Sequence, residues 1–217
     1  MRKICYIVGA GNSDGVTFRP AENDIVIAAD GGYEVLKKLG IKPQLALGDF
    51  DSLGYIPEDV EHLSFPPEKD DTDMRLAIFG ARERGYADIV IFGGLGGRLD
   101  HTIGNIQNLQ FISHNGRAWL WGEGTAATVI TNGSITFPGK CSGMFSVLAI
   151  GGNAEGVTLW GCKYPLDKAE LKCDIPLGVS NEFVGSEAVV RVEKGSLLVI
   201  WNCSATEFDE MIKDGYC

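Results

Sequence analysis

The sequence lacks any long apolar run. No stretch of its 217 residues approaches the roughly 18 apolar residues that a membrane-spanning helix needs. The N-terminal segment MRKICYIVGAG reaches glycine after about five apolar residues, whereas the apolar core of a secretion signal needs roughly 7–15. We therefore expect no export and no membrane span, and we predict that this segment forms a first buried strand.

The six cysteines also lack the spacing of a metal or redox site. No C-x-x-C pair occurs among them, and their intervals are irregular. Structural zinc needs closely spaced pairs of ligands, so a zinc site is not expected. In a chain without an export signal, such cysteines are typically reduced thiols that fill the core. These features predict a cytoplasmic protein.

Basic residues are in the minority. Lys and Arg number 19 against 29 Asp and Glu, which gives a net charge of -10 with His neutral. A nucleic-acid binder needs a basic face for phosphate contacts, so this balance argues against that class of partner. An acidic chain suits metal ions or a cationic small molecule, although solubility alone accounts for the charge equally well. At 45% hydrophobic residues the composition is that of a globular protein with one large or two small domains.

The first half alternates strand-like and helix-like segments. Helical periodicity predicts two long helices, one over Asp73–Arg84 and one over Leu99–Ser113, with Leu99, Ile103, Ile106 and Leu109 on the buried face of the second. The apolar runs that read as buried strands are Ile4–Val8, Asp24–Ala29, Ala87–Phe92 and Ala118–Trp121. Strands separated by helices of this length predict a doubly wound parallel sheet, and we assign it to residues 1–124.

The second half, residues 125–217, shows no helical periodicity. Short strand-like runs alternate with turn signals at Thr131-Asn132-Gly133, Pro138-Gly139, Gly151-Gly152-Asn153 and Lys194-Gly195. The six predicted strands are Ala126–Ile130, Gly133–Phe137, Met144–Ile150, Val157–Trp160, Ala188–Val192 and Leu197–Trp201. This pattern predicts a small antiparallel β-sandwich or barrel. The fold class is thus α/β followed by all-β.

Acidic residues gather at the carboxyl ends of the predicted strands, where open α/β sheets bind ligands. Asp30 ends one strand, Asp49 and Asp51 follow the Leu45–Leu47 run, Asp73 opens the first long helix, and Asp100 opens the second. Clustered carboxylates repel unless a cation neutralises them, and carboxylate oxygens are ligands for magnesium. Each turn alone is also explained by helix capping or by the helix dipole. Four such turns in one half-chain favour a metal site.

A glycine-rich segment follows the predicted strand Ala87–Phe92. Four of the five residues Gly93–Gly97 are glycines, and a helix follows. Backbone N–H groups in such a loop can face an anion, and Arg98 adds a planar cation suited to phosphate. No Gly-Lys-Ser/Thr follows, so this is not a Walker loop. Together with the acidic turns, the loop predicts a polyphosphate-binding domain that uses magnesium.

Seven motifs carry a resemblance to a known family. In order they are ADGG, GDFDS, KDDTD, GGRLDHTIGN, GVTLWGCKYPL, VSNEF and KGSLLVIW, spanning about residues 28–201. Together these motifs resemble the thiamine pyrophosphokinase family. The resemblance implies transfer of the diphosphate of ATP to the hydroxyethyl group of thiamine, which gives thiamine diphosphate and AMP, with Mg²⁺ as cofactor. It also implies a homodimer whose active sites are shared between subunits.

The resemblance implies roles for individual residues. The metal-binding carboxylates are Asp30, Asp49, Asp51 and Asp73, and the catalytic residues are Asp73, Asp51 and Arg98. Residues for ATP and its phosphates are Gly94, Gly96, Gly97, Arg98, Asp100, Lys69 and Asp70. Thiamine contacts fall to Ser180, Asn181 and Val199, and whether Val199 or Trp201 covers the pyrimidine stays open. His101 and Asn105 match family positions and are read as scaffold residues.

Three rival functions remain. A diphosphokinase for another alcohol, such as a hydroxymethylpterin, shares the nucleotide site and differs in the second half, where VSNEF and GCKYPL favour thiamine. A nucleotide-sugar transferase could use Asp49-Phe50-Asp51, but the glycine loop and D-x-T-D favour diphosphate transfer. A non-catalytic nucleotide or thiamine sensor could discard some of the acidic residues, and all are present here.

Overall fold

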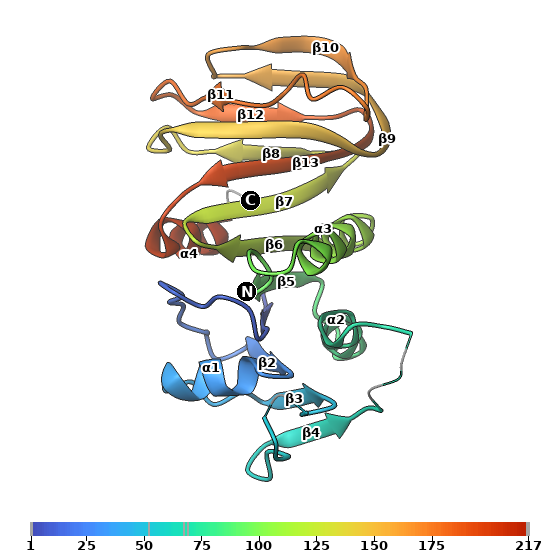
Figure 1. Ribbon diagram of the computed structural model, residues 1–217. Coiled ribbons are helices and arrows are strands. Elements are labelled where there is room, and N and C mark those ends of the chain that lie inside the picture. Colours follow the sequence, from blue (N-terminus) through green and yellow to red (C-terminus); the bar gives the residue numbers. More distant parts are fainter. Residues whose placement is uncertain (1, 52, 67, 69, 216–217) are drawn as a thin grey trace. The chain divides into compact units, whose positions relative to one another are not determined.

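The computed structural model describes residues 2–51, 53–66, 68 and 70–215, and it divides into two compact units (Figure 1). The first unit comprises residues 1–108 and 115–123, and the second comprises residues 109–114 and 124–217. Among the described residues, no helix is long and apolar enough to cross a membrane.

The first unit is built on a six-stranded sheet. Its strands are β1 (Ile4–Val8), β2 (Ile25–Ala29), β3 (Leu45–Gly48), β4 (Glu61–Ser64), β5 (Asp88–Phe92) and β6 (Arg117–Gly122). They lie in the order β4-β3-β2-β1-β5-β6, and every pairing is parallel. Strands β1, β2, β3 and β5 are buried along their whole length, because helices cover both faces of a parallel sheet. The predicted doubly wound sheet is confirmed.

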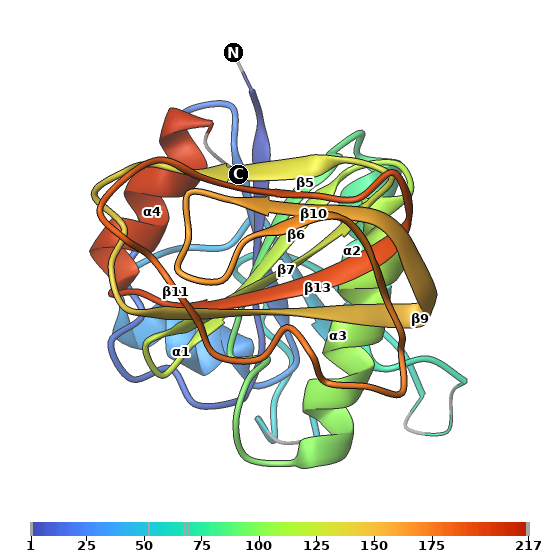
Figure 2. The same ribbon diagram turned by 90° about the horizontal axis from the view of Figure 1, so that it is seen from above.

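Helices cover the two faces of this sheet. Helix α1 (Gly32–Lys38) lies on one face, and α2 (Asp73–Glu83) and α3 (Leu99–Ser113) lie on the other (Figures 1 and 2). Thr72 caps α2 by accepting a hydrogen bond from the Arg75 backbone N–H at 3.2 Å, and Gly85 follows its last turn with φ +79°. The helix predicted over Asp73–Arg84 is confirmed, and Met74, Ala77, Ile78 and Ala81 are buried on one face of it.

The predicted buried face of α3 is wrong in its first turns. Leu99 is 71% exposed and Ile103 is 49% exposed, whereas the amides Asn105 and Asn108 are buried. Both amides have partners inside the unit: Asn105 donates to the Gly94 carbonyl, and Asn108 accepts from the Arg75 guanidinium. The need for these hydrogen bonds outweighs the apolar periodicity.

The second unit contains two antiparallel sheets that share one strand. Its strands are β7 (Thr125–Thr131), β8 (Ser134–Phe137), β9 (Met144–Trp160), β10 (Leu166–Leu171), β11 (Asn181–Glu182), β12 (Ala188–Arg191) and β13 (Lys194–Asn202). The order is β7-β13-β9-β12-β8, and β10 and β11 also pair with β9. The interior contains Phe145, which stacks on Phe183 at 4.6 Å, and Phe137, which meets Trp201 edge-on at 5.2 Å. The predicted β-rich half is confirmed.

Strand β9 corrects one prediction. The runs Met144–Ile150 and Val157–Trp160 are parts of a single 17-residue strand, and Gly151-Gly152-Asn153 is not a turn. The first part of β9 pairs with β13, and the later part pairs with β10 and β12. Gly151, with φ +74°, lets the strand bend between the two sheets, and Figure 2 shows this curvature.

Five elements escaped prediction: α1, β4, β10, β11 and α4 (Ala205–Asp214). Helix α1 has seven residues and β4 is exposed throughout, so neither carries a readable apolar pattern. Helix α4 did carry one. Ser204 and Glu207 form a reciprocal capping box, and Phe208, Met211 and Ile212 are buried on one face. The S-x-x-E spacing before those apolar residues is the signal that could have found it.

Candidate functional site

Three carboxylates converge at the ends of neighbouring strands. Asp30 directly follows β2, and Asp49 and Asp51 follow β3, which pairs with β2 in parallel register. One oxygen from each carboxylate lies within 4.8 Å of the others. Asp30 and Asp49 are half-buried, and Asp51 is exposed. The three side chains therefore face one small volume.

The backbone around these carboxylates is unusual. Asp30 and Phe50 have φ values of +47° and +58°, in the left-handed region that non-glycine residues seldom adopt. The Asp30 N–H donates to the Leu47 carbonyl at 2.7 Å, which joins the two strand ends. A Cβ at Gly48 would lie 3.0 Å from the Asp30 Cα, so only glycine fits there. Phe50 is 3% exposed and anchors the turn in the core.

The donor set suits a hard divalent cation. Three carboxylates so close together repel one another, and a cation with oxygen preference relieves that repulsion. The backbone N–H of Asp51 donates to the Asp49 carboxylate at 3.2 Å, which keeps the turn compact. The residues present therefore fit Mg²⁺.

The other residues of the acidic motif are arranged differently. Asp73 is the first residue of α2 and lines a cavity together with Asp30 and Thr72, but it lies outside the group of three. Asp70 is exposed, and Asp71 pairs with Arg75 at 3.1 Å. Lys69 falls outside the described residues. The motif thus contributes one carboxylate to the cavity wall.

The glycine loop packs against a second glycine turn. Gly93, Gly96 and Gly97 all have positive φ, between +63° and +79°. A Cβ at Gly11 would lie 2.3 Å from the Gly93 carbonyl oxygen, so the turn after β1 and the loop after β5 approach backbone to backbone. The buried Asn105 amide donates to the Gly94 carbonyl at 2.9 Å and holds the loop from behind. Backbone N–H groups held in this way are suited to phosphate.

The cavity lies at the point where the strand order reverses. From β1 the chain adds β2, β3 and β4 on one side and β5 and β6 on the other, and ligands of open α/β sheets bind at such a switch point. The cavity has a volume of about 650 Å³. Its predicted lining residues are Asp30, Asp73, Gly94, Gly96, Gly97, Arg98, Asp100, His101 and Asn105. Residues from three separate motifs, ADGG, KDDTD and the glycine loop with its following helix, are therefore brought together.

Arg98 is held at the rim of this cavity by Asp100. The guanidinium donates to both carboxylate oxygens, at 2.6 Å and 3.2 Å, in a two-pronged pair. The guanidinium and the His101 backbone N–H lower the pKa of Asp100 to about 2. Arg98 is 72% exposed, so much of it stays open to a ligand.

Sequence reasoning missed part of the cavity wall. Gly9, Ala10 and Gly11, which follow β1, line it, and so does Thr72. The Gly9-x-Gly11 spacing after the first strand was a signal, but it reads as half of a dinucleotide fingerprint with its third glycine misplaced. Its role follows only when β1 and β5 are known to be neighbours.

The residues assigned to thiamine lie in the second unit and differ in exposure. Ser180 is exposed, with φ +63°, and its N–H donates to the Ser146 hydroxyl. Asn181 is 4% exposed: it donates to the Tyr164 carbonyl at 2.8 Å and accepts from the Tyr164 N–H at 3.1 Å. Val199 and Trp201 are both buried. Asn181 thus holds the turn at residues 162–164, and the thiamine assignments stay predictions.

Comparisons with known proteins agree in both halves. The family model of the thiamin pyrophosphokinase catalytic domain matches residues 20–120, and that of the thiamin pyrophosphokinase vitamin B1 binding domain matches residues 134–198. A thiamine pyrophosphokinase of Bacillus subtilis (strain 168) is 32% identical over 187 residues, which cover 82% of this chain and 87% of the relative.

Solved structures give the same result. The crystal structure of thiamine pyrophosphokinase from Bacillus subtilis aligns with a TM-score of 0.82 and 29% identity, over 92% of this chain and 99% of the other. The thiamin pyrophosphokinase structure from Geobacillus thermodenitrificans aligns with a TM-score of 0.78 and 28% identity, over 94% of this chain and 99% of the other.

Proposed function

The chain belongs to the thiamine pyrophosphokinase family, and on this premise we propose that it transfers the diphosphate of ATP to the hydroxyethyl oxygen of thiamine, releasing AMP. One observation carries the proposal. Three converging carboxylates and the cavity of the glycine loop lie at the same edge of one parallel sheet, and Asp30 belongs to both. That arrangement suits a polyphosphate with its cation.

The cation we propose is Mg²⁺, held by Asp30, Asp49 and Asp51 with Asp73 nearby. Bound there, it would neutralise charge on the phosphate oxygens. The three carboxylates supply the hard oxygen ligands that it needs, within 4.8 Å of one another. The remaining ligand positions would be filled by water and by the nucleotide.

The protein's own residues then position the reactants. Backbone N–H groups of Gly94, Gly96 and Gly97 face the phosphates, and Arg98 binds the transferred group from the rim. The thiamine oxygen attacks the β-phosphorus as the bond between that phosphorus and the oxygen of the AMP leaving group breaks. We assign to Asp73 the acceptance of the alcohol proton, because its carboxylate lines the cavity at the start of α2.

We propose that thiamine binds through the second unit, with Ser180, Asn181 and Val199 near the aminopyrimidine. Within one chain Val199 is buried in β13 and the Asn181 amide is bonded to Tyr164, so Asn181 acts through the shape of the turn that it holds. The active form we propose is a homodimer with shared sites. The exposed apolar side chains Leu99 and Ile103 on α3 support a covered face there.

The dimer has its own test. Ile103→Asp exchanges an exposed side chain, so it should leave the folded monomer stable while it weakens a dimer that covers α3. Sedimentation velocity should show a dimer for the native chain and a monomer for the variant. A native chain that sediments as a monomer contradicts the proposal.

The location we propose is the cytoplasm. Cys5, Cys141, Cys162, Cys173 and Cys203 are free thiols, and a reducing compartment keeps cysteines in that state.

The proposed activity is tested by incubating the protein with ATP, Mg²⁺ and thiamine, and separating the thiamine species after oxidation to fluorescent thiochromes. Thiamine diphosphate should appear, and it should not appear without a divalent cation. A parallel incubation with a hydroxymethylpterin tests the rival alcohol. Conversion of the pterin but not of thiamine would assign the chain to that rival substrate, and no conversion of either would favour a sensor.

A further inference from the structure

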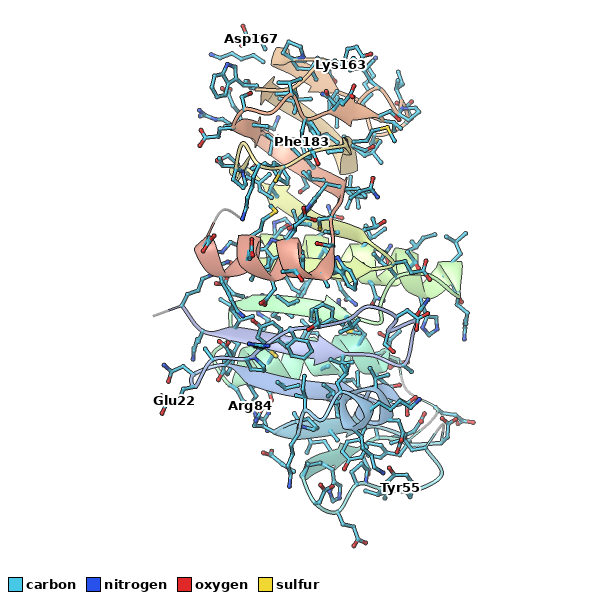
Figure 3. The ribbon with its side chains drawn as sticks, turned by 90° about the vertical axis from the view of Figure 1, so that its left-hand side faces the viewer. Glu22, Tyr55, Arg84, Lys163, Asp167 and Phe183 are labelled. Atoms are coloured by element: carbon cyan, nitrogen blue, oxygen red, sulfur yellow. The ribbon has the colours of Figure 1, made fainter. Side chains whose placement is uncertain are left out.

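Two tyrosines and two carboxylates connect α1 to the loop at residues 49–60. Tyr33 of α1 donates to the Asp59 carboxylate at 2.6 Å, and Tyr55 of the loop donates to the Glu34 carboxylate of α1 at 2.5 Å. The two rings meet edge-on, with centroids 6.4 Å apart. We call these four residues the tyrosine clasp. Figure 3 shows Tyr55 within its loop.

Each half of the clasp is supported by a lysine. Lys42 lies 3.6 Å from the Asp59 carboxylate, and Lys37 lies 3.6 Å from the Glu34 carboxylate. Hydrogen bonding to Asp59 raises the pKa of Tyr33 to about 12, so the phenol remains a donor throughout the physiological range. Tyr33 is 8% exposed, and its ring forms part of the core. The clasp is therefore supported by ion pairs on both sides and by the burial of the Tyr33 ring.

The clasp lies close to the carboxylates of the site along both chain segments. Asp30 precedes Tyr33 by three residues, and its carbonyl accepts the Tyr33 N–H at 3.2 Å. On the other side, the Phe50 carbonyl accepts from the N–H groups of Leu53 and Gly54, so the turn after Asp51 leads directly to Tyr55. Moving either half of the clasp would shift one side of the acidic group relative to the other.

Electrostatic repulsion favours separation of the three carboxylates when no cation is bound. Without a cation, repulsion among Asp30, Asp49 and Asp51 pushes the ends of β2 and β3 apart, and the left-handed φ values of Asp30 and Phe50 add strain. A restraint between the two segments that follow these strands opposes this motion. Preorganised ligands bind a cation more tightly, because less free energy is spent in bringing them together.

We infer that the tyrosine clasp positions the three carboxylates for a divalent cation, so that Tyr33 and Tyr55 set metal affinity without touching metal or substrate. This inference rests on the metal site of the proposed function. Mn²⁺ serves as the probe, because free Mn²⁺ is measured directly by electron paramagnetic resonance in the absence of nucleotide.

The test titrates Mn²⁺ into the metal-free native chain and into Tyr33→Phe/Tyr55→Phe, which keeps both rings and removes both hydroxyls. The Kd should rise about tenfold, as is common for residues that orient metal ligands. The kcat at saturating Mg²⁺ should stay within about twofold of the native value, since the clasp acts before the metal is bound. Asp59→Asn, which keeps an oxygen to accept from Tyr33, should retain most of the affinity.

Tyr86→Phe is the matched control. Its hydroxyl donates to the Asn23 carbonyl at 3.1 Å, away from the acidic group, so Kd should not change. An unchanged Kd in the double tyrosine variant overturns the clasp. If Asp51→Asn still weakens binding in that case, the proposed metal site stands. An unchanged Kd in Asp51→Asn as well overturns the metal assignment on which both rest.

Discussion

The two units of the molecule differ in how well the position of a motif in the sequence predicts where its side chains lie in the structure. In the first unit, residues from motifs after β2, β3 and β5 face one edge of the sheet, and Asp30 belongs both to the acidic group and to the cavity. In the second unit, Ser180 is exposed, Asn181 is buried and internally bonded, and Val199 is buried. Parallel strands bring all their carboxyl ends to one edge, whereas antiparallel strands place successive turns at opposite ends. Strand-end reasoning is therefore strong for the first unit and weak for the second.

The largest effect should come from the acidic group of the first unit. Asp51→Asn keeps the shape of the side chain and removes one charge from a cluster of three. We expect kcat to fall on the order of a hundredfold, about 3 kcal/mol of transition-state stabilisation. Steady-state kinetics at saturating Mg²⁺ measures the fall, and the melting temperature should not change.

Glu83→Gln, at the end of α2, is the control for a lost carboxylate and should be nearly silent. If Asp51→Asn has native kinetics at saturating metal, Asp51 is not part of the proposed metal site. Motif position would then predict function no better in the first unit than in the second.

The glycine loop should give the next largest effect. Arg98→Lys keeps the charge but loses the planar fork that binds two oxygens at once. The KM for ATP should rise about tenfold while the KM for thiamine changes little, because the residue lies at the rim of the cavity that we propose for the phosphates. Arg191→Lys, an exposed arginine of the second unit, is the matched control. An equal rise in both KM values would show that Arg98 does not discriminate between the two substrates.

A substitution in the second unit should mainly lower the stability of the fold. Asn181→Ala removes three hydrogen bonds, those with the Tyr164 N–H, the Tyr164 carbonyl and the Cys162 thiol. Losing these part-buried hydrogen bonds should lower the free energy of unfolding by about 2–4 kcal/mol. Denaturant unfolding measures this loss, with Asn202→Ala at an exposed position as the control.

At a temperature where Asn181→Ala is folded, a raised KM for thiamine would support a role of this turn in binding. Unchanged stability together with an unchanged KM would contradict both roles.

The smallest effect concerns the Arg98–Asp100 pair. Arg98 lowers the pKa of Asp100 to about 2, below its ordinary value near 3.8. A carboxyl with a lowered pKa in the folded state stabilises the fold above the unfolded pKa and loses that contribution as pH falls. The stability difference between the native chain and Asp100→Asn should therefore be constant above about pH 5 and shrink from pH 4 to pH 2. A difference that is independent of pH would contradict the pairing in solution.

Some features of the site could be predicted from the sequence and others could not. The proximity of Asp30 to Asp49 and Asp51 could be predicted, because it depends only on strand order and on the ends of parallel strands. The exposure of Leu99 and Ile103 could not be predicted. The buried face of α3 carries two amides instead, and their hydrogen-bond partners, Gly94 and Arg75, lie outside this helix. Periodicity reports local preference and carries no information on such distant partners.

Glycine signals were ambiguous for a related reason. Gly151-Gly152 has the composition of a turn and is a bend within β9, because the pairing of β9 with β13, β10 and β12 continues on both sides. Gly9-x-Gly11 has the composition of an incomplete fingerprint and is a close approach of two backbones. In both places the conformation follows from which strands are neighbours.

We propose that the first unit directs the attack of thiamine at the β-phosphorus of ATP. Phosphorus NMR of one reaction mixture, containing the protein, ATP, Mg²⁺ and thiamine, tests it most directly. We expect AMP and thiamine diphosphate to appear in equal amounts from the first time point. We expect neither product to form with Asp51→Asn. Appearance of ADP with thiamine monophosphate would mean transfer of the γ-phosphoryl group alone and would contradict the account.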